Sequence, residues 1–243
     1  MGNVIEDSWD TYKTHINLVL LFSIPFVISL IIPLLAPLPT YTSIGGIFLR
    51  TTSIFSNADP IVIAVIIVSL FLSLLFISFA FVAISLIVKA KRTKTKNPRH
   101  VLWGIEKHTS RVFVILLLYF LMILIANIIG YFMGIQAFLT GLVGFAAFFL
   151  MFFAPTAVVI DDKRVVRALK DGFRITMEWP RYFIIWLAMM FLAVSALDYA
   201  IIALAGNALS SYIVLVLSSL FVLPYFVIFQ AEAYMKRFHL LRH

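Results

Sequence analysis

Long runs of apolar residues dominate this chain, and charged or turn-forming residues separate them. The runs fall at 17–37, 60–88, 111–133, 137–160, 182–205 and 211–235. As an α-helix rising ~1.5 Å per residue, each run is long enough to cross about 30 Å of hydrocarbon. The pattern therefore predicts an all-α polytopic membrane protein with six transmembrane helices. The composition agrees, since only 12% of the 243 residues are charged, whereas about a quarter are charged in a typical soluble domain.

The basic residues predict the orientation of these helices. Eighteen of the nineteen lysines and arginines lie before the first run, after the last, or in the connections 89–111 and 161–181, and only Arg50 falls on the other side. Because Lys and Arg accumulate in short cytoplasmic segments, we expect a multi-pass protein of the cell membrane with both termini in the cytoplasm. We interpret this basic surface as a contact for anionic lipid headgroups or a partner and not for nucleic acid. The residues predicted to make that contact are Lys91, Arg92, Lys94, Arg164, Arg167, Lys170 and Arg174.

Short amphipathic segments precede the first, third and fifth runs. Ile5, Trp9, Tyr12 and Ile16 share one helical face, and so do Val165, Leu169, Phe173 and Met177. The segment 102–109 is a weaker example. We therefore predict one membrane domain over 1–243, built from three parallel repeats of about 1–99, 100–162 and 163–243. Each repeat would consist of an amphipathic interface helix and a transmembrane hairpin.

One stretch of the second half resembles a known family. It contains Ala154-Pro155, then the 158–162 segment Val-Val-Ile-Asp-Asp, then the 168–173 segment Ala-Leu-Lys-Asp-Gly-Phe, with Pro224 and Tyr234 further on. This pattern is similar to that of a broad group of six-helix prokaryotic membrane proteins, which includes the membrane domain of some glycerophosphodiester phosphodiesterases. The resemblance covers roughly the last hundred residues in motif and the first half only in layout. It implies an integral membrane module, and without the soluble phosphodiesterase domain it implies no hydrolase activity.

Asp198 is the clear candidate for an ionisable residue within a predicted span. It lies seventeen residues past Arg181, about 25 Å along a helix, which places it near the outer boundary of the bilayer and not at its centre. Two interpretations stay open. Asp198 is either an acid at the outer interface or part of a polar pocket with Asn127 or Arg50.

The remaining features are structural expectations. Pro155 and Pro224 are expected to kink the fourth and sixth spans and to place a cavity between them. Glu232 precedes Lys236 by four residues, which favours an ion pair along the last helix. The five histidines lack the neighbours of a metal site, so we expect neither a metal nor a cofactor.

The sequence also lacks the motifs of hydrolases, nucleotide-driven proteins and intramembrane proteases. We accordingly expect a non-catalytic membrane subunit, scaffold or lipid-interacting module, with a membrane-protein partner or a homo-oligomer as its context. Two alternatives remain: a small transporter or exporter component for a lipid or hydrophobic solute, and a lipid-modifying enzyme.

Overall fold

The computed structural model describes residues 2–35, 40–43, 46–49, 59–93, 98–205 and 207–239. Within these ranges the side chains of 4–34, 59–93, 104–204 and 210–236 are described. The elements are, in chain order, α1 (Gly2–Thr14), α2 (Ile16–Leu35), β1 (Thr40–Ser43), β2 (Gly46–Leu49), α4 (Pro60–Thr93), α5 (Pro98–Phe132), α6 (Gln136–Met151), α7 (Ala154–Asp161), α8 (Val165–Glu178), α9 (Pro180–Ala205), α10 (Asn207–Leu217), the π-helix η1 (Ser218–Val222) and α11 (Leu223–His239).

The six predicted spans are confirmed as helical segments long and apolar enough to cross a membrane. They are Ile16–Leu34, Pro60–Thr93, Gly104–Phe132, Gln136–Asp161, Pro180–Leu204 and Ser210–Lys236. The fourth span combines α6 with α7, and the sixth combines α10, η1 and α11. The second span extends past residue 88 to Thr93, because lysine and arginine favour the helix and continue it beyond the apolar run.

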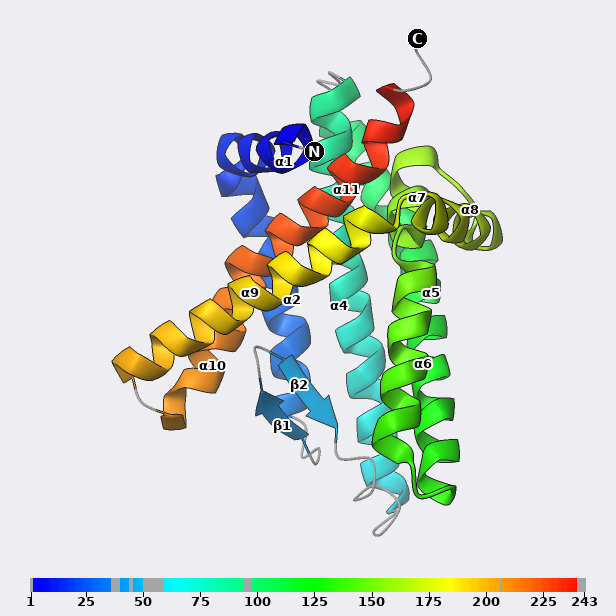
Figure 1. Ribbon diagram of the computed structural model, residues 1–243, viewed down its shortest axis with the longest axis vertical. Coiled ribbons are helices and arrows are strands. Elements are labelled where there is room, and N and C mark those ends of the chain that lie inside the picture. Colours follow the sequence, from blue (N-terminus) through cyan, green and yellow to red (C-terminus); the bar gives the residue numbers. More distant parts are fainter. Residues whose placement is uncertain are drawn as a thin grey trace.

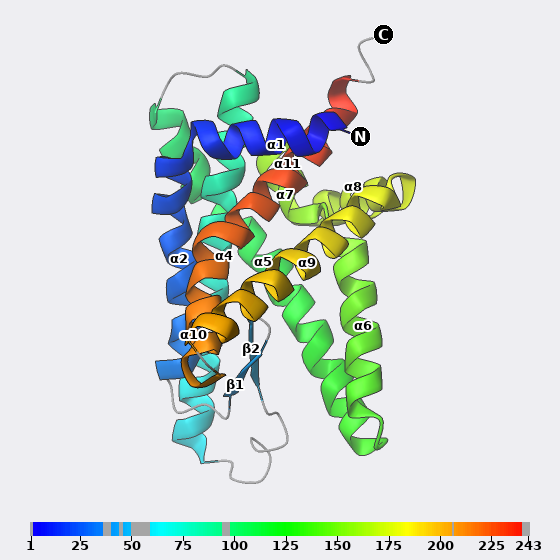
Figure 2. The ribbon, with the colours of Figure 1, turned by 60° about the vertical axis from the view of Figure 1, so that its left-hand side comes forward.

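The long helices α4, α5 and α6 run side by side, while α1 and α8 lie across one end of them (Figure 1). Both chain ends are at this end of the molecule, as an even number of spans requires. We call it the basic end, because α1, α8 and the lysines and arginines of α4 and α5 gather there. Figure 2 shows that α9 does not run parallel to α4, α5 and α6 but crosses the molecule at a steep inclination.

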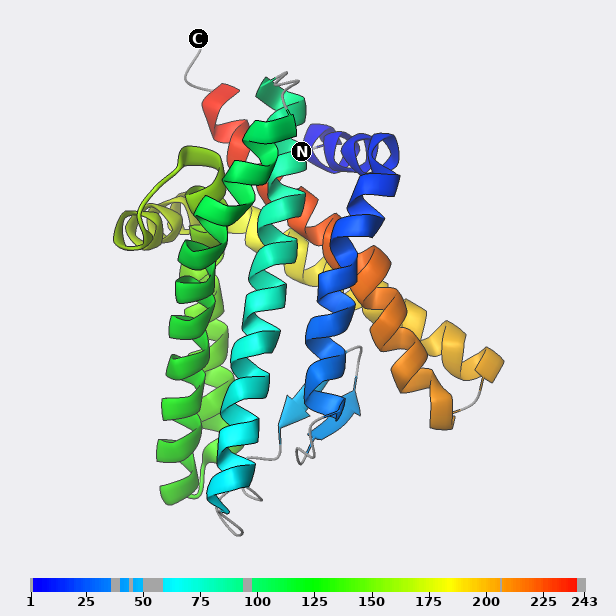
Figure 3. The same cartoon turned by 180° about the vertical axis from the view of Figure 1, so that it is seen from behind.

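The middle interface helix that the repeat pattern predicts is not a separate element. α5 is one continuous helix from Pro98 to Phe132, so the segment 102–109 is its first part. Of the three predicted interface helices, α1 and α8 form separate elements that lie across the long helices (Figure 3). The prediction was wrong on this point because nothing in 98–111 stops a helix: no proline follows Pro98, and Gly104 lies against Leu86 of α4, where its small size allows close packing.

The all-α prediction needs one addition, between α2 and α4. β1 and β2 form an antiparallel hairpin in which Thr40 pairs with Leu49 and Ser43 pairs with Gly46. The hairpin contains Tyr41, Thr42, Ile47 and Phe48, which are residue types that favour strands. The two strands are too short to form a layer of their own, so the fold remains a helical membrane bundle.

The core of the bundle lies toward the basic end, where α4, α7 and α11 pack together. Every side chain from Val82 to Val88 of α4 and from Ala154 to Ile160 of α7 is buried. Away from this end the helices diverge. Only 6% of the most apolar stretch of α9 is buried, against 50% of the corresponding stretch of Gln136–Asp161. Most of α9 therefore faces the surroundings and not the protein, and in a membrane those surroundings are lipid.

Candidate functional site

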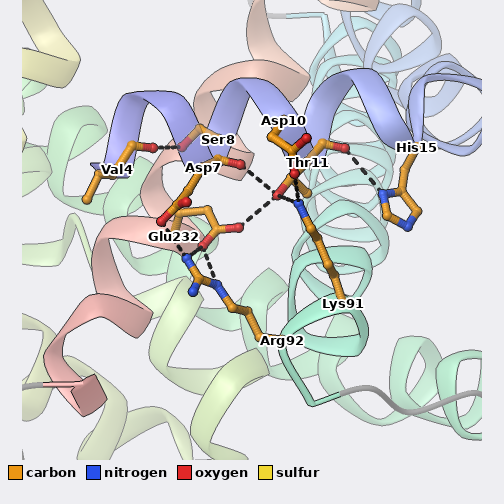
Figure 4. Close-up of polar contacts among 9 residues, drawn as sticks. All are labelled: Val4, Asp7, Ser8, Asp10, Thr11, His15, Lys91, Arg92 and Glu232. Carbon is orange, nitrogen blue, oxygen red and sulfur yellow. Dashed lines mark hydrogen bonds and ion pairs between the residues drawn. The ribbon is translucent and has the colours of Figure 1, made fainter. Parts of the chain in front are cut away.

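A carboxylate of α11, buried within the basic end, joins three helices. The Glu232 side chain is 0% exposed. Arg92 of α4 donates from Nε and Nη2 to Glu232 Oε2 at 2.9 and 2.7 Å, and Thr11 of α1 donates to Oε1 at 2.9 Å (Figure 4). Both carboxylate oxygens therefore accept hydrogen bonds, and the two bonds to Oε2 come from a charged donor. Such bonds offset the large cost of removing the charge from water.

Two more acids of α1 complete this arrangement, which we call the Glu232 cluster: Asp7, Asp10, Thr11, Lys91, Arg92 and Glu232. Asp7 accepts from Arg92 Nη2 at 2.8 Å, and Asp10 accepts from Lys91 Nζ at 2.5 Å. The hydrogen bond and the attraction of Lys91 lower the pKa of Asp10. Lys91 and Arg92, which the sequence assigned to lipid contact, are thus engaged by carboxylates of the protein itself. Lys94, assigned with them, lies outside the described residues.

The Glu232 cluster also corrects the partner expected for Glu232. Among the described residues Glu232 pairs with Arg92 and not with Lys236. Its side chain points into the packing of α11 against α1 and α4, where a buried carboxylate needs a cation at close range. Arg92 is 140 residues away in the chain, so no local spacing could identify it.

A second group of ion pairs surrounds the turn that follows α7. Asp162 adopts a left-handed conformation with φ of 55°. Its side chain contacts Lys107 and accepts from Arg111 Nη1 at 2.9 Å, both from α5. The hydrogen bond from Lys107, together with the attraction of that lysine, lowers the pKa of Asp162. Asp161 accepts from Tyr234 Oη of α11 at 2.7 Å. The turn therefore connects α5, α7 and α11.

The same turn also places α8 against α7. Lys163 Nζ lies 2.7 Å from Asp161 and 2.9 Å from Asp171, so one ammonium bridges the turn and the interface helix. Gly172 faces the start of α7 so closely that a Cβ would lie 2.6 Å from the backbone nitrogen of Ala154. The residues that carry the family resemblance thus make packing and ion-pair contacts in this chain.

The helices are interrupted at both of the prolines singled out in the sequence. α6 ends at Met151 and α7 begins at Ala154, so Pro155 lies in the first turn of α7, where its missing N–H costs nothing. Gln230 Nε2 of α11 donates to the carbonyl oxygen of Phe152, inside this break. Pro224 follows the π-helix η1 directly, at the second residue of α11.

Aromatic side chains occupy the space between these two breaks. Trp186 of α9 has its ring centroid 5.5 Å from that of Phe152 and 5.4 Å from that of Phe226. Its indole N–H donates to the carbonyl oxygen of Phe226 at 3.1 Å. Phe183 adds a further ring, 5.2 Å from Phe152. The region where the sequence placed a cavity is therefore filled by packed rings.

Gln230→Leu is expected to destabilise the protein by about 1–3 kcal/mol, because it leaves the buried Phe152 carbonyl without a donor. The measurement is the free energy of unfolding in detergent micelles, followed by circular dichroism. Thr156→Val is the matched control, since the Thr156 hydroxyl is buried in the same region without a hydrogen-bond partner. Equal losses for the two variants would contradict a role for this hydrogen bond.

The structure does not bring together the residues of the hypothetical polar pocket. Asn127 of α5 accepts from Gln136 Nε2 at 3.0 Å and donates to Thr140 Oγ1 at 3.3 Å, so it serves the turn between α5 and α6. Asp198 lies on α9, whose far end points away from that turn (Figures 1 and 3). Arg50 lies outside the described residues. The described contacts therefore contain no pairing of Asp198 with Asn127.

α8 carries the remaining cations of the predicted lipid contact. Arg164 stands at its N-terminus, and Arg167, Lys170 and Arg174 follow on its exposed side. Beside these cations the same helix exposes Val166, Phe173 and Met177, at 79%, 44% and 56%. An exposed apolar stripe flanked by cations is the feature of this molecule that calls for an external ligand.

No group of three or more His, Cys, Asp or Glu side chains with the arrangement of a metal site occurs within the part of the chain that the structure describes. No family model, no curated protein and no solved structure matches this chain. Function must therefore be inferred from the geometry of the molecule itself.

Proposed function

We propose that this protein is a non-catalytic membrane module that binds anionic lipid through α8 at the cytoplasmic face. The observation that carries the proposal is the exposed apolar stripe of α8 with free cations along its edge. A membrane-surface helix needs both parts, because its apolar side chains enter the acyl region while its cations contact headgroup phosphates.

The packing of α8 supports a position at the membrane surface. Ala168, Gly172 and Ile175 are buried against the rest of the protein, which fixes one side of the helix. Val166, Phe173 and Met177 lie on an adjoining side and touch little of the protein. In water these three side chains would form an exposed apolar patch, whereas in a membrane the lipid acyl chains would solvate them.

The cations of α8 differ from those of the Glu232 cluster and of the Asp161–Asp162 turn in having few carboxylate partners among the described residues. Arg167 and Lys170 are exposed and form no ion pair with any described residue. Arg174 lies 3.6 Å from Asp171 and 3.7 Å from Glu178 with 63% of its side chain exposed, a kind of pair that contributes little. Lys91, Arg92, Lys107, Arg111 and Lys163 are by contrast held by carboxylates. Phosphate oxygens of lipid are suitable partners for the free cations of α8.

The junction of α8 with α9 adds an aromatic anchor at the same level. The rings of Trp179 and Tyr182 stack at 5.9 Å, and the guanidinium of Arg181 lies 4.9 Å and 5.2 Å from their centres. Tyr182 is buried in the core, whereas Trp179 is partly exposed, and tryptophan collects at membrane interfaces because its ring is amphipathic. Together with the basic residues, this anchor supports placing the basic end at the cytoplasmic surface.

Three related units account for how the module is built. The helices that close the units, α4, α7 and α11, pack on one another, and each leads into a Lys-Arg pair at 91–92, 163–164 or 236–237. The element that opens each unit carries a small buried residue: Ser8 in α1, Gly104 in α5 and Gly172 in α8. The elements α5 and α8 pack on the closing helix of the preceding unit, and α1 packs on that of the last. This cyclic arrangement supports a threefold repeat in which α8 presents the lipid-binding surface.

The double variant Arg167→Gln/Lys170→Gln tests the proposal. Each cation near an anionic surface contributes about 1 kcal/mol, so binding of phosphatidylglycerol is expected to weaken about thirtyfold. The measurement is native mass spectrometry of the purified protein titrated with phosphatidylglycerol, with phosphatidylcholine as the neutral lipid.

The control is Lys13→Gln/Lys236→Gln, which removes the same charge from two cations outside α8 and its aromatic anchor. It should retain most of the lipid binding. If both double variants lose binding equally, the net charge of the basic end explains the affinity and the proposed role of α8 is wrong. If the wild-type protein does not prefer the anionic lipid, the proposal fails altogether.

A further inference from the structure

Three cations follow one another along the exposed side of α8. Arg167, Lys170 and Arg174 are separated by three and four residues, so at 3.6 residues per turn they form one row along the helix. All three are exposed. From the first cation to the last the row is about 10 Å long, at ~1.5 Å per residue. One phosphate group is much shorter than this row, whereas two phosphate groups separated by a helical turn would occupy it.

The two sides of this cation row differ in character. On one side lies the apolar stripe of Val166, Phe173 and Met177, and on the other lie the acids Asp171 and Glu178. The acids would repel an anion that approaches from their side. An anion that approaches along the apolar stripe meets the cations first. The row therefore favours phosphates that are carried by a lipid over phosphate from solution.

Arg174 is the cation that extends the row by a further turn. Its Nη2 lies 3.6 Å from Asp171 and its Nε lies 3.7 Å from Glu178, and both distances are longer than a hydrogen bond. All eleven acidic side chains of the chain are among the described residues, and only these two pair with a cation of the row. A phosphate can approach more closely and accept two parallel N–H bonds from the guanidinium.

We propose that α8 binds a lipid with two phosphodiester groups, of the diphosphatidylglycerol class, with one phosphate at Arg167 and Lys170 and the other at Arg174. This inference rests on the proposed binding of anionic lipid by α8 and names the class of lipid. A three-carbon bridge joins the two phosphates of such a lipid, and its length is of the order of one helical turn, about 5.4 Å. The acyl chains of both halves would lie against the apolar stripe beside the row.

The test is native mass spectrometry of the full-length protein titrated with diphosphatidylglycerol, phosphatidylglycerol or, as the neutral lipid, phosphatidylcholine. Because the second phosphate is tethered to the first, its contact with Arg174 should make diphosphatidylglycerol bind about five- to thirtyfold more tightly than phosphatidylglycerol. If only one phosphate can be bound at a time, the second one raises the affinity by a statistical factor of about two.

The double variant Arg174→Gln/Glu178→Gln assigns this preference to the second cation, because it leaves the net charge unchanged. It is expected to reduce the preference for diphosphatidylglycerol to about twofold, since one phosphate then lacks its cation. The matched control is Glu6→Gln/Lys13→Gln, which also conserves the net charge and changes two exposed residues of α1. This control should keep the full preference.

The outcomes separate this inference from the proposed function. A wild-type protein that prefers phosphatidylglycerol over phosphatidylcholine, but binds diphosphatidylglycerol only about twofold more tightly, overturns the inference and leaves the proposed function intact. Lack of preference for either anionic lipid overturns both. A preference that persists in Arg174→Gln/Glu178→Gln comes from the additional acyl chains or from other cations, and it overturns the inference. Equal loss in the α1 control also overturns it, because the preference would then not depend on α8.

Discussion

Arg92→Met is expected to destabilise the protein by about 3–5 kcal/mol, because it leaves the charge of Glu232 buried without its cation. Thr11 alone would then compensate a carboxylate whose side chain is 0% exposed. The free energy of unfolding in detergent micelles, measured by circular dichroism, reports the effect. The substitution should also weaken the packing of α1, because Arg92 Nη2 donates to Asp7 of that helix as well.

Lys91→Met is the matched control for this prediction. Lys91 is the neighbouring residue and also pairs with an acid of α1, but Asp10 has 67% of its side chain exposed. Surface pairs of this kind contribute at most ~1 kcal/mol, so the control should lose little. The double variant Arg92→Met/Glu232→Leu removes both charges and should recover most of the stability. Similar losses in Lys91→Met and Arg92→Met would show that burial of Glu232 does not determine the effect.

Gly172→Ala is expected to destabilise the protein by about 1–3 kcal/mol, although alanine is the better helix former. The added Cβ would lie 2.6 Å from the nitrogen and 2.8 Å from the Cα of Ala154. These are backbone atoms, so α8 has to move away from α7 as a whole. The same unfolding measurement gives the magnitude, and lipid binding by α8 provides a second readout.

The control for this second prediction is Gly141→Ala in α6. A Cβ at Gly141 would meet nothing within 4 Å, so only the helix propensity changes and stability should rise by up to ~1 kcal/mol. Opposite signs for the two substitutions are the expected outcome. A stabilising Gly172→Ala would mean that the close contact of α7 with α8 is not required by the fold.

These contacts explain why such an apolar chain folds into a single arrangement of its helices. Transmembrane helices gain little from contact between apolar surfaces, since lipid solvates those surfaces equally well. Specific contacts at the basic end therefore determine which helices meet: the Glu232 cluster for α1, α4 and α11, and the Asp161–Asp162 turn for α5, α7 and α11. Away from these contacts the helices diverge, which leaves most of α9 outside the packed core.

The sequence alone correctly predicted the six segments that are long and apolar enough to span a membrane. The length and hydropathy of such a segment are local properties, and the hydrocarbon thickness sets the length that is required. The helical spacing of apolar residues in 5–16 and 165–177 likewise predicted helices where α1 and α8 are found. The third interface helix was missed for a local reason as well: nothing in its sequence ends a helix before α5 continues into the membrane.

Only the tertiary structure decided which polar groups meet. Lys236 follows Glu232 at a favourable spacing, yet the buried face of α11 is directed to Arg92, 140 residues away. Counting residues from Arg181 placed Asp198 near the outer boundary of the bilayer, but α9 is steeply inclined to α4, α5 and α6, so the count along the helix does not measure depth. Counting along a sequence measures distance along a helix, whereas depth and pairing depend on the angles at which helices pack.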